Sequence, residues 1–269
     1  MTDYILHEEG TFRLGVFCSL LLVMVIWETL DPKRRRIYAR RERWFGNLGI
    51  IVFNTAVMRV ALPFLAVDVA LFTGKKGWGL FNALDWTAGL EVLLAIILLD
   101  LVVYWQHRIF HLVPLLWRLH KVHHTDRDFD ATTALRFHPV EIWLSMLLKI
   151  SVVFVFGVSA LAVILFEVIL NGMALFNHAN IRLPEKVETA LRLFVVTPDM
   201  HRIHHSVRSD EFNRNFGFNL SLWDRLFSSY CGVPRESQEL MTIGQSDHQS
   251  DEARSLIFML MLPFRRSQL

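Results

Sequence analysis

The sequence predicts an all-α integral membrane protein, a helical bundle of about five crossings with a histidine-rich cap on its cytosolic side. Three observations lead to this prediction. Hydrophobic residues make up 53% of the chain and its mean hydropathy is positive, both high for a soluble protein. Several apolar stretches approach the roughly 20 residues that cross a bilayer as a helix. Twelve histidines occur, and eight of them fall in three short clusters.

Net charge and cysteine content exclude several other classes of protein. The formal net charge of +2 is too small for a nucleic-acid-binding protein, and the basic residues cluster locally instead of covering one face. Cys18 lies in an apolar stretch and Cys231 in a polar one, so neither a disulfide framework nor a cysteine-based zinc site is available. We therefore expect a membrane and a lipid as partners and no nucleic acid. Histidine and carboxylate remain as the protein's metal ligands.

The flanking residues orient the first two spans. Glu8 and Glu9 precede the apolar residues 12–30, where a cleavable signal peptide would be basic, so we expect a retained span. Seven lysines and arginines follow within residues 33–43. Since positive charge stays on the cytoplasmic side, the amino terminus is predicted outside. The second span, residues 47–72, contains Pro63, where we expect a kink.

A third span, residues 86–105, is predicted to return to the cytoplasmic side after a short external loop. It delivers His107 and His111 to the mouth of the bundle. Residues 142–176 are nearly unbroken in apolar character and too long for one ordinary span, with Gly157 and Ser159 near their middle. They predict a helical hairpin that crosses and comes back.

The hairpin ends beside His178, again inside, so the topology brings every histidine cluster to one side of the membrane. Residues 256–264 are too few to cross and precede Arg265, which indicates an interfacial helix. No repeats appear, and we expect residues 1–269 to form a single domain. We expect an integral, multi-pass membrane protein in the inner membrane of a bacterium or the endoplasmic reticulum of a eukaryote.

The spacing of the histidines predicts a metal site. Spacings of three and four residues bring side chains onto one face of a helix. The clusters are His107/His111, His120/His123/His124 and His201/His204/His205. Neutral imidazole is a common ligand of zinc, iron and copper. With His178 the histidines exceed the three or four ligands of one zinc, whereas two metals fit. A dinuclear iron site can activate dioxygen to attack a C–H bond.

Residues 85–230 resemble the fatty acid hydroxylase/sterol desaturase superfamily of membrane di-iron oxygenases. The resemblance lies in the histidine boxes and in WRLHKVHH, RFHPVE, FNHANIRLP, TPDMHRIHH, and NFG with WDRLFSSY. It implies two iron ions, dioxygen as co-substrate and a lipid substrate such as a fatty acyl chain, sterol or ether lipid. Hydroxylation is favoured, although desaturation uses the same oxidant. The implied iron ligands are His107, His111, His120, His123, His124, His178, His201, His204 and His205.

The resemblance also implies an external electron donor, because the chain shows no haem, flavin or iron–sulfur pattern. A reductase, ferredoxin or cytochrome type would serve. Some relatives place a second histidine four residues after His178, where this chain has Arg182. We therefore consider His138 as an additional ligand or as a support for the ligands.

Several other polar residues are expected near the site. Asp100 and Tyr104 share a helical stripe with the first histidine pair and are expected to orient imidazoles, unless they are an unrelated interfacial pair. Glu167 and Asn171 share a stripe with His178. They are expected to line the substrate chamber or position His178, with a protonated Glu167 bonded to a neighbouring helix as the alternative.

A second small set of polar residues precedes the hairpin. Arg136, His138 and Glu141 are expected to form a polar collar on the site or, alternatively, a helix-start cap beside Pro139.

Two other functions use the same histidines. A metal-dependent lipid hydrolase would use metal-bound water and would work without oxygen. A metal-storage or transport protein should carry ionisable ligands near mid-membrane, whereas these histidines are expected at the membrane's edge.

Overall fold

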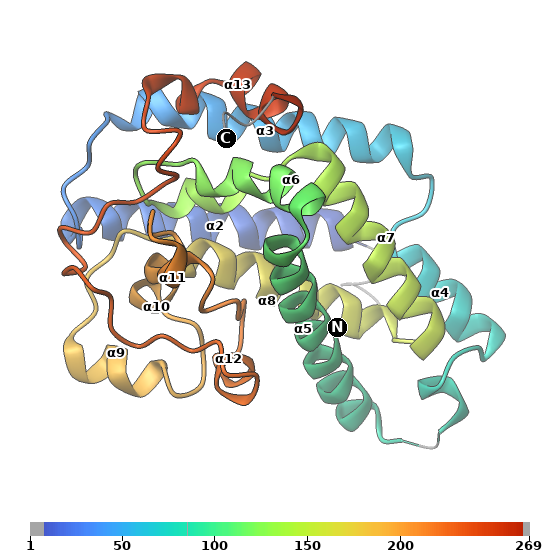
Figure 1. Cartoon of the computed structure of the whole chain (residues 1–269). Helices are drawn as coiled ribbons and strands as arrows, with labels where there is room; N and C mark the ends of the chain where they lie inside the picture. The colour runs from blue at the N-terminus through green and yellow to red at the C-terminus, as the bar shows by residue number, and fades with distance from the viewer. Residues whose placement is uncertain (1–7, 85, 266–269) are drawn as a thin grey trace.

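Long apolar helices form the body of the structure, a computed structural model that describes residues 8–84 and 86–265 (Figure 1). They are α2 (Glu9–Leu30), α3 (Arg40–Ala61), α5 (Ala88–Leu112), α7 (Pro139–Phe156) and α8 (Ala160–Asn177). Five stretches are long and apolar enough to cross a membrane, one of them being Arg40–Ala83, which joins α3 to the shorter helices that follow it. No β-strand occurs in the described residues. The all-α class and the multi-pass membrane character are confirmed.

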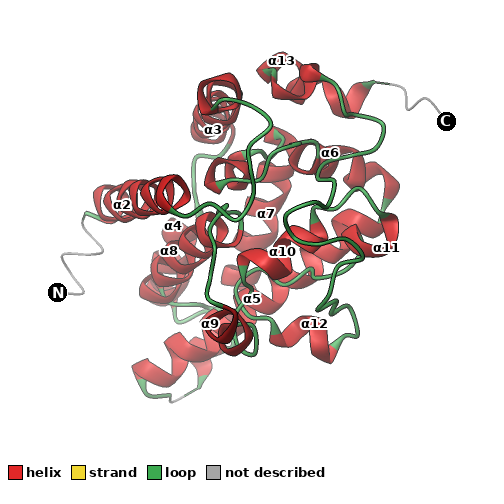
Figure 2. Ribbon diagram, turned by 90° about the vertical axis from the view of Figure 1, so that its left-hand side faces the viewer, coloured by secondary structure: helices red, strands yellow, loops and turns green. Residues whose placement is uncertain are grey.

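The side chains on the outside of the bundle suit a bilayer. Leu22, Val52 and Val155 lie on three different long helices and are each more than half exposed. Figure 2 shows α2 at the edge of the bundle. Lipid, unlike water, imposes no penalty on such apolar faces.

The second span differs from its prediction. We expected one kinked helix, but the helical run ends at Ala61 and resumes as α4 (Ala66–Lys76), so Pro63 lies in a complete break. Proline has no N–H group and restricts the residue before it, which explains why the helix stops here. Asp68 restarts the helix by accepting the backbone N–H of Leu65 at 2.9 Å. Helix α4 packs against α7 and α8.

The predicted hairpin is present as α7 and α8. Gly157 ends α7 in the left-handed conformation, with φ of +65°, and Ser159 caps α8 by accepting the N–H of Ala162. A Cβ atom on Gly157 would lie 2.4 Å from the backbone oxygen of Trp78. Both the positive φ and this close approach require glycine.

Short helices and loops form a cap on one side of the bundle, on the left in Figure 1. They are α9 (Glu185–Leu191), α10 (Pro198–His204), α11 (Ser209–Phe212) and α12 (Leu222–Leu226). Helix α6 (Pro114–His124) follows α5 after a single residue, Val113, and packs back against it.

Buried polar contacts tie the loop after α6 to α2 and α3. Arg43, at the start of α3, is wholly buried and donates to Asp126 and Asp130 in the loop after α6. Glu28, near the end of α2, accepts the backbone N–H groups of Ala131 and Asn180. Arg43 belongs to the basic segment used to orient the chain, so part of that segment's charge is neutralised inside the protein.

The carboxyl-terminal segment lies along the bundle as α13 (Leu256–Met261). Phe258 and Met259 pack with Ile50 of α3 and Val122 of α6. Ile257, on the outer face, is 72% exposed. An apolar outer face suits the predicted interfacial helix, whose contact with a bilayer stays a prediction.

Candidate metal centre

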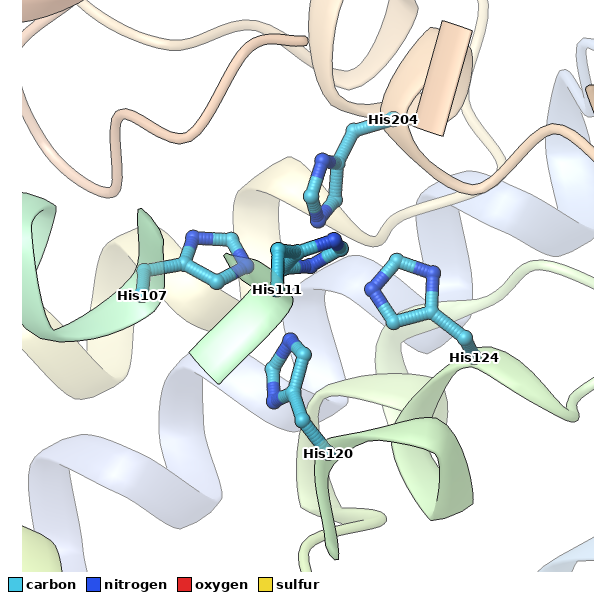
Figure 3. A group of neighbouring side chains, drawn as sticks. All are labelled: His107, His111, His120, His124 and His204. Atoms are coloured by element: carbon cyan, nitrogen blue, oxygen red, sulfur yellow. The ribbon is translucent and has the colours of Figure 1, made fainter. Parts of the chain in front are cut away.

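The structure gathers the nine candidate histidines into two groups. Within each group the ligand atoms lie within 4.8 Å of one another. The five-histidine group contains His107, His111, His120, His124 and His204, and the four-histidine group contains His123, His178, His201 and His205. Figure 3 shows the rings of the five-histidine group pointing toward one another from three helices, α5, α6 and α10.

Helical geometry explains how the histidines are divided. Residues four apart differ in direction by about 40° around a helix, whereas adjacent residues differ by about 100°. On α6, His120 and His124 accordingly join the five-histidine group while His123 joins the other. On α10 the four-apart pair is His201 and His205, which share the four-histidine group. Each His-x-x-His-His pattern therefore supplies both groups.

Hydrogen bonds at one nitrogen fix the orientation of several rings. The Nδ1 atoms of His107, His178 and His204 donate to backbone carbonyl oxygens at 2.7–2.8 Å. A carbonyl oxygen only accepts, so Nδ1 carries the proton and Nε2 keeps its lone pair. His120 Nδ1 lies 2.6 Å from a carboxylate oxygen of Glu141. These contacts leave Nε2 as the metal-binding atom.

The remaining nitrogens are buried and lack partners among the described residues. Nε2 of His107, His120 and His204 has none, and neither ring nitrogen of His111, His124 or His205 has one. In the other group, His178 Nε2 lies 3.1 Å from His123 Nε2 and 3.0 Å from His201 Nε2. Burying so many polar atoms without partners is costly. A metal ion in each group would satisfy them, so the donor set fits two metals.

Burial keeps the imidazoles outside the spanning helices neutral at pH 7. It lowers the pKa of His120 to about 3 and, against a hydrogen bond to the Ala174 carbonyl, that of His178 to about 4. Burial and the neighbouring histidines also hold the pKa well below 6.5 for others, namely His123, His124, His201, His204 and His205. Neutral imidazole is the form that binds a metal.

Comparison with known proteins identifies the family. The model of the fatty acid hydroxylase family matches residues 92–229, more than half of the chain. The chain belongs to the fatty acid hydroxylase family. All nine histidines lie inside the matched residues.

Curated relatives of this hydroxylase-family chain are oxidative lipid enzymes by name. Ornithine lipid hydroxylase OlsE of Rhizobium tropici is 23% identical over 93% of this chain and 75% of its own length. Human alkylglycerol monooxygenase is 28% identical over 58% of this chain, which spans only 34% of that relative. Human lathosterol oxidase is 25% identical over 84% of this chain and 73% of the relative. No solved structure matches the chain.

Asp100 and Tyr104 differ from their expected role because neither contacts a histidine. Asp100 accepts the backbone N–H groups of Asn219 and Leu220 and the indole N–H of Trp223. The Tyr104 hydroxyl bonds Ser229 at 2.8 Å. Both residues hold the segment 216–229 against α5. That segment contributes the Phe216 carbonyl to His107, so they support one ligand through the backbone.

Asp224 is a supporting residue that sequence reasoning missed. Its carboxylate accepts the backbone N–H groups of Phe216 and Gly217 at 2.7 and 2.8 Å and the hydroxyl of Ser229 at 2.7 Å. It thereby fixes the turn whose carbonyl orients His107. The only signal was the WDRLFSSY motif, which indicates a family but not a contact.

His138 lies outside both groups, which corrects its assignment as an additional ligand. Its Nδ1 accepts the N–H of Val140 at the start of α7, and its Nε2 lies 3.3 Å from the Leu260 carbonyl. It is thus the helix-start cap, the alternative expected beside Pro139. Arg182, four residues after His178, is half exposed and pairs with Asp31.

Glu167 and Asn171 also lie outside both groups. The Glu167 carboxylate is buried and bonds Lys149 of α7 and Arg13 of α2, both at 2.6 Å. Asn171 is exposed, and His178 Nδ1 bonds the Ala174 carbonyl instead. Glu167 does lie on the same helix that leads to His178, but its partners place it between helices and not beside the histidine groups. The alternative, a Glu167 bonded to a neighbouring helix, matches these contacts, with ion pairs in place of a protonated carboxyl group.

Proposed function

We propose that the protein is a membrane di-iron oxygenase that hydroxylates a lipid with dioxygen and electrons from an external donor. The observation that carries the proposal is the pair of adjoining histidine groups at one end of an apolar bundle, nine buried or half-buried imidazoles of which eight have an unpartnered ring nitrogen. Family membership and the oxidative lipid enzymes among the relatives support a lipid-modifying oxidoreductase.

The two groups would each hold one iron ion. When bound, the iron supplies the activation of dioxygen that side chains cannot perform. The chain's own contribution is to present neutral Nε2 atoms in fixed directions and to exclude water. The hydrogen bonds at Nδ1 of His107, His178 and His204 fix three of those directions. Hardly any of these imidazoles contacts solvent, and His111 is the one that is only half-buried.

The bilayer is the proposed source of the substrate. Exposed apolar side chains surround the junction of α5 and α6, including Ile109, Leu112 and Leu115. His111 lies between them along the chain, so a lipid chain at this junction would lie close to the five-histidine group. A fatty acyl chain, a sterol or an ether lipid all offer unactivated C–H bonds. We place this end of the bundle on the cytoplasmic side, where a reductase, ferredoxin or cytochrome could reach it.

Lipid analysis of producing cells tests the proposal. Membranes that contain the wild-type protein are expected to hold a lipid species with one additional oxygen atom, and membranes with the His123→Ala variant should lack it. The His248→Ala variant, whose side chain lies in neither group, is the matched control and should keep the product. A product that lacks two hydrogens would indicate desaturation instead. Identical lipids in wild type and His123→Ala, at equal protein levels, would reject an oxidative role.

A further inference from the structure

Glu141 is the one carboxylate among the described residues that hydrogen-bonds a histidine of either group. It lies in the first turn of α7, is 3% exposed, and its Oε1 is 2.6 Å from His120 Nδ1. The other Nδ1 partners in the two groups are backbone carbonyl oxygens, those of Phe216, Ala174 and Arg214. Glu141 is therefore a distinct kind of partner.

The ordinary reason for an acidic residue at this position does not explain the contact. A carboxylate in the first turn stabilises a helix by interacting with free backbone N–H groups, usually at the surface. Here His138 Nδ1 accepts the N–H of Val140 and already caps the helix. The second carboxylate oxygen of Glu141 is buried and has no partner within the described ranges. His120 is thus the one hydrogen-bond partner of the Glu141 carboxyl group among the described residues.

The contact determines which nitrogen of His120 faces the metal position. A carboxylate accepts the proton of Nδ1, so the lone pair stays on Nε2. That Nε2 atom is buried, unpartnered and part of the five-histidine group. A charged acceptor also makes the imidazole a stronger donor than a neutral carbonyl does. His111 and His124 of the same group have no partner at either nitrogen. His120 is therefore one of three rings in the group that a hydrogen bond holds, and the one held by a carboxylate.

We propose that Glu141 is a positioning residue that orients His120 and tightens metal binding at the five-histidine group alone. The inference rests on the proposed function, in which each group holds one metal. It goes further by making the two metal positions unequal, since the four-histidine group has no carboxylate partner among residues 8–84 and 86–265.

Metal titration tests the inference without measuring turnover. Metal-free protein in detergent is titrated with Co²⁺, whose absorption reports ligand geometry, and with Fe²⁺ under anaerobic conditions. The wild type is expected to show two binding events. Glu141→Leu should weaken one of them by about 10- to 100-fold, the usual effect of removing such a partner, and leave the other unchanged. Glu141→Gln should lie between, because its amide oxygen still accepts the Nδ1 proton.

A double variant separates positioning from folding. In a His120→Ala background, Glu141→Leu should change neither binding event further, because the ring that it orients is gone. Glu91→Gln is the matched control, since Glu91 lies at the other end of α5 and accepts the N–H of Ser159. Thermal unfolding shows whether each variant is folded.

The outcomes distinguish this inference from the proposed function. If Glu141→Leu binds both metals with wild-type affinity, or if both binding events weaken equally, the positioning role is overturned and the two-metal centre stays intact. Additive effects in the double variant would also overturn it. A wild-type protein that binds no metal would overturn the proposed function itself.

Discussion

On α6 and on α10, histidines four residues apart serve one group and the histidine between them serves the other. His123 and His204 are these intermediate residues, and each crosses to the group opposite its cluster neighbours. The two groups are therefore interleaved, and each metal position depends on both helices.

Removing either intermediate histidine should remove one metal, not two. For His123→Ala and His204→Ala we expect about one metal ion per chain in place of two and loss of essentially all turnover. Removing only the supporting partner of a ligand already lowers metal affinity or activity by about 10- to 100-fold. Metal analysis of the purified variants and product assays measure both effects. His248→Ala should retain two metals and most activity. The other control residue, His7, lies outside the described residues. Full metal content in His123→Ala would remove that residue from the ligand set.

The buried imidazoles make the metal-free protein sensitive to acid. The folded-state pKa values of His120 and His178, about 3 and 4, lie below the 6.5 of free histidine. Below pH 6.5 the unfolded chain therefore binds protons that the folded chain does not. The contribution of these histidines to the free energy of unfolding is fully present above about pH 6.5 and falls toward pH 4. Each histidine lowers this free energy by up to about 1.4 kcal/mol for every pH unit. Unfolding midpoints at pH 7.5 and 5.5 measure this, and equal midpoints would contradict it.

At the residue scale the sequence predicted which histidines come together better than it predicted the residues that support them. Histidine clusters are visible because the ligands lie close together in the chain. The supports are distant in sequence: Glu141 is 21 residues from His120, and Asp224 acts on His107 through the backbone of Phe216. Spacing along one helix suggested Asp100, Tyr104 and Glu167 instead, but it does not reveal what a neighbouring helix offers.

Among the elements, α2, α7 and α8 are linked by a buried ion cluster. Glu167 pairs with Lys149 and with Arg13, whose side chains are 16% and 28% exposed. Since Glu167 is paired with one cation from each of two neighbouring helices, and Arg13 also with Glu9, the cluster holds the helices in register.

Glu167→Leu should destabilise the bundle without removing metal. Glu167→Leu would leave Lys149 without its carboxylate partner and Arg13 with Glu9 alone. This is expected to cost about 3 kcal/mol of unfolding free energy, and Glu167→Gln should cost less. Replacing Arg13, Lys149 and Glu167 together by leucine or methionine should recover part of the loss. Unfolding in detergent and metal analysis provide the two readouts. A Glu167→Leu variant as stable as wild type but lacking a metal would place Glu167 at the metal site.

The elements themselves were largely predictable because the bilayer imposes their length. Residues 12–30 and the hairpin at Gly157 correspond closely to α2 and to α7 and α8. The break at Pro63 was underestimated as a kink, since apolar residues continue through α4 and mask the interruption. The positions of the cap helices required tertiary contacts such as that of Asp100 with Trp223 of α12, which no local pattern shows.

For the whole molecule, five spans and one histidine-rich end imply opposite sides for the two termini. We expect reporters fused at residue 5 and after residue 269 to appear outside and inside the cytoplasm, respectively. An odd number of crossings requires this difference, and the basic segment before α3 sets its direction. Reporter activity on the same side for both fusions would contradict the topology.

Labelled dioxygen tests most directly whether a two-metal centre of this protein inserts oxygen into a lipid. Protein purified anaerobically and loaded with iron is given a reductant, lipid extract and ¹⁸O₂, and lipids and metals are measured by mass spectrometry. We predict about two iron ions per chain and one ¹⁸O atom in a lipid product that disappears with His204→Ala. Protein loaded with zinc should bind the metal but form no product, because zinc has no redox chemistry. A product labelled from water, or formed equally well without oxygen, would contradict the account.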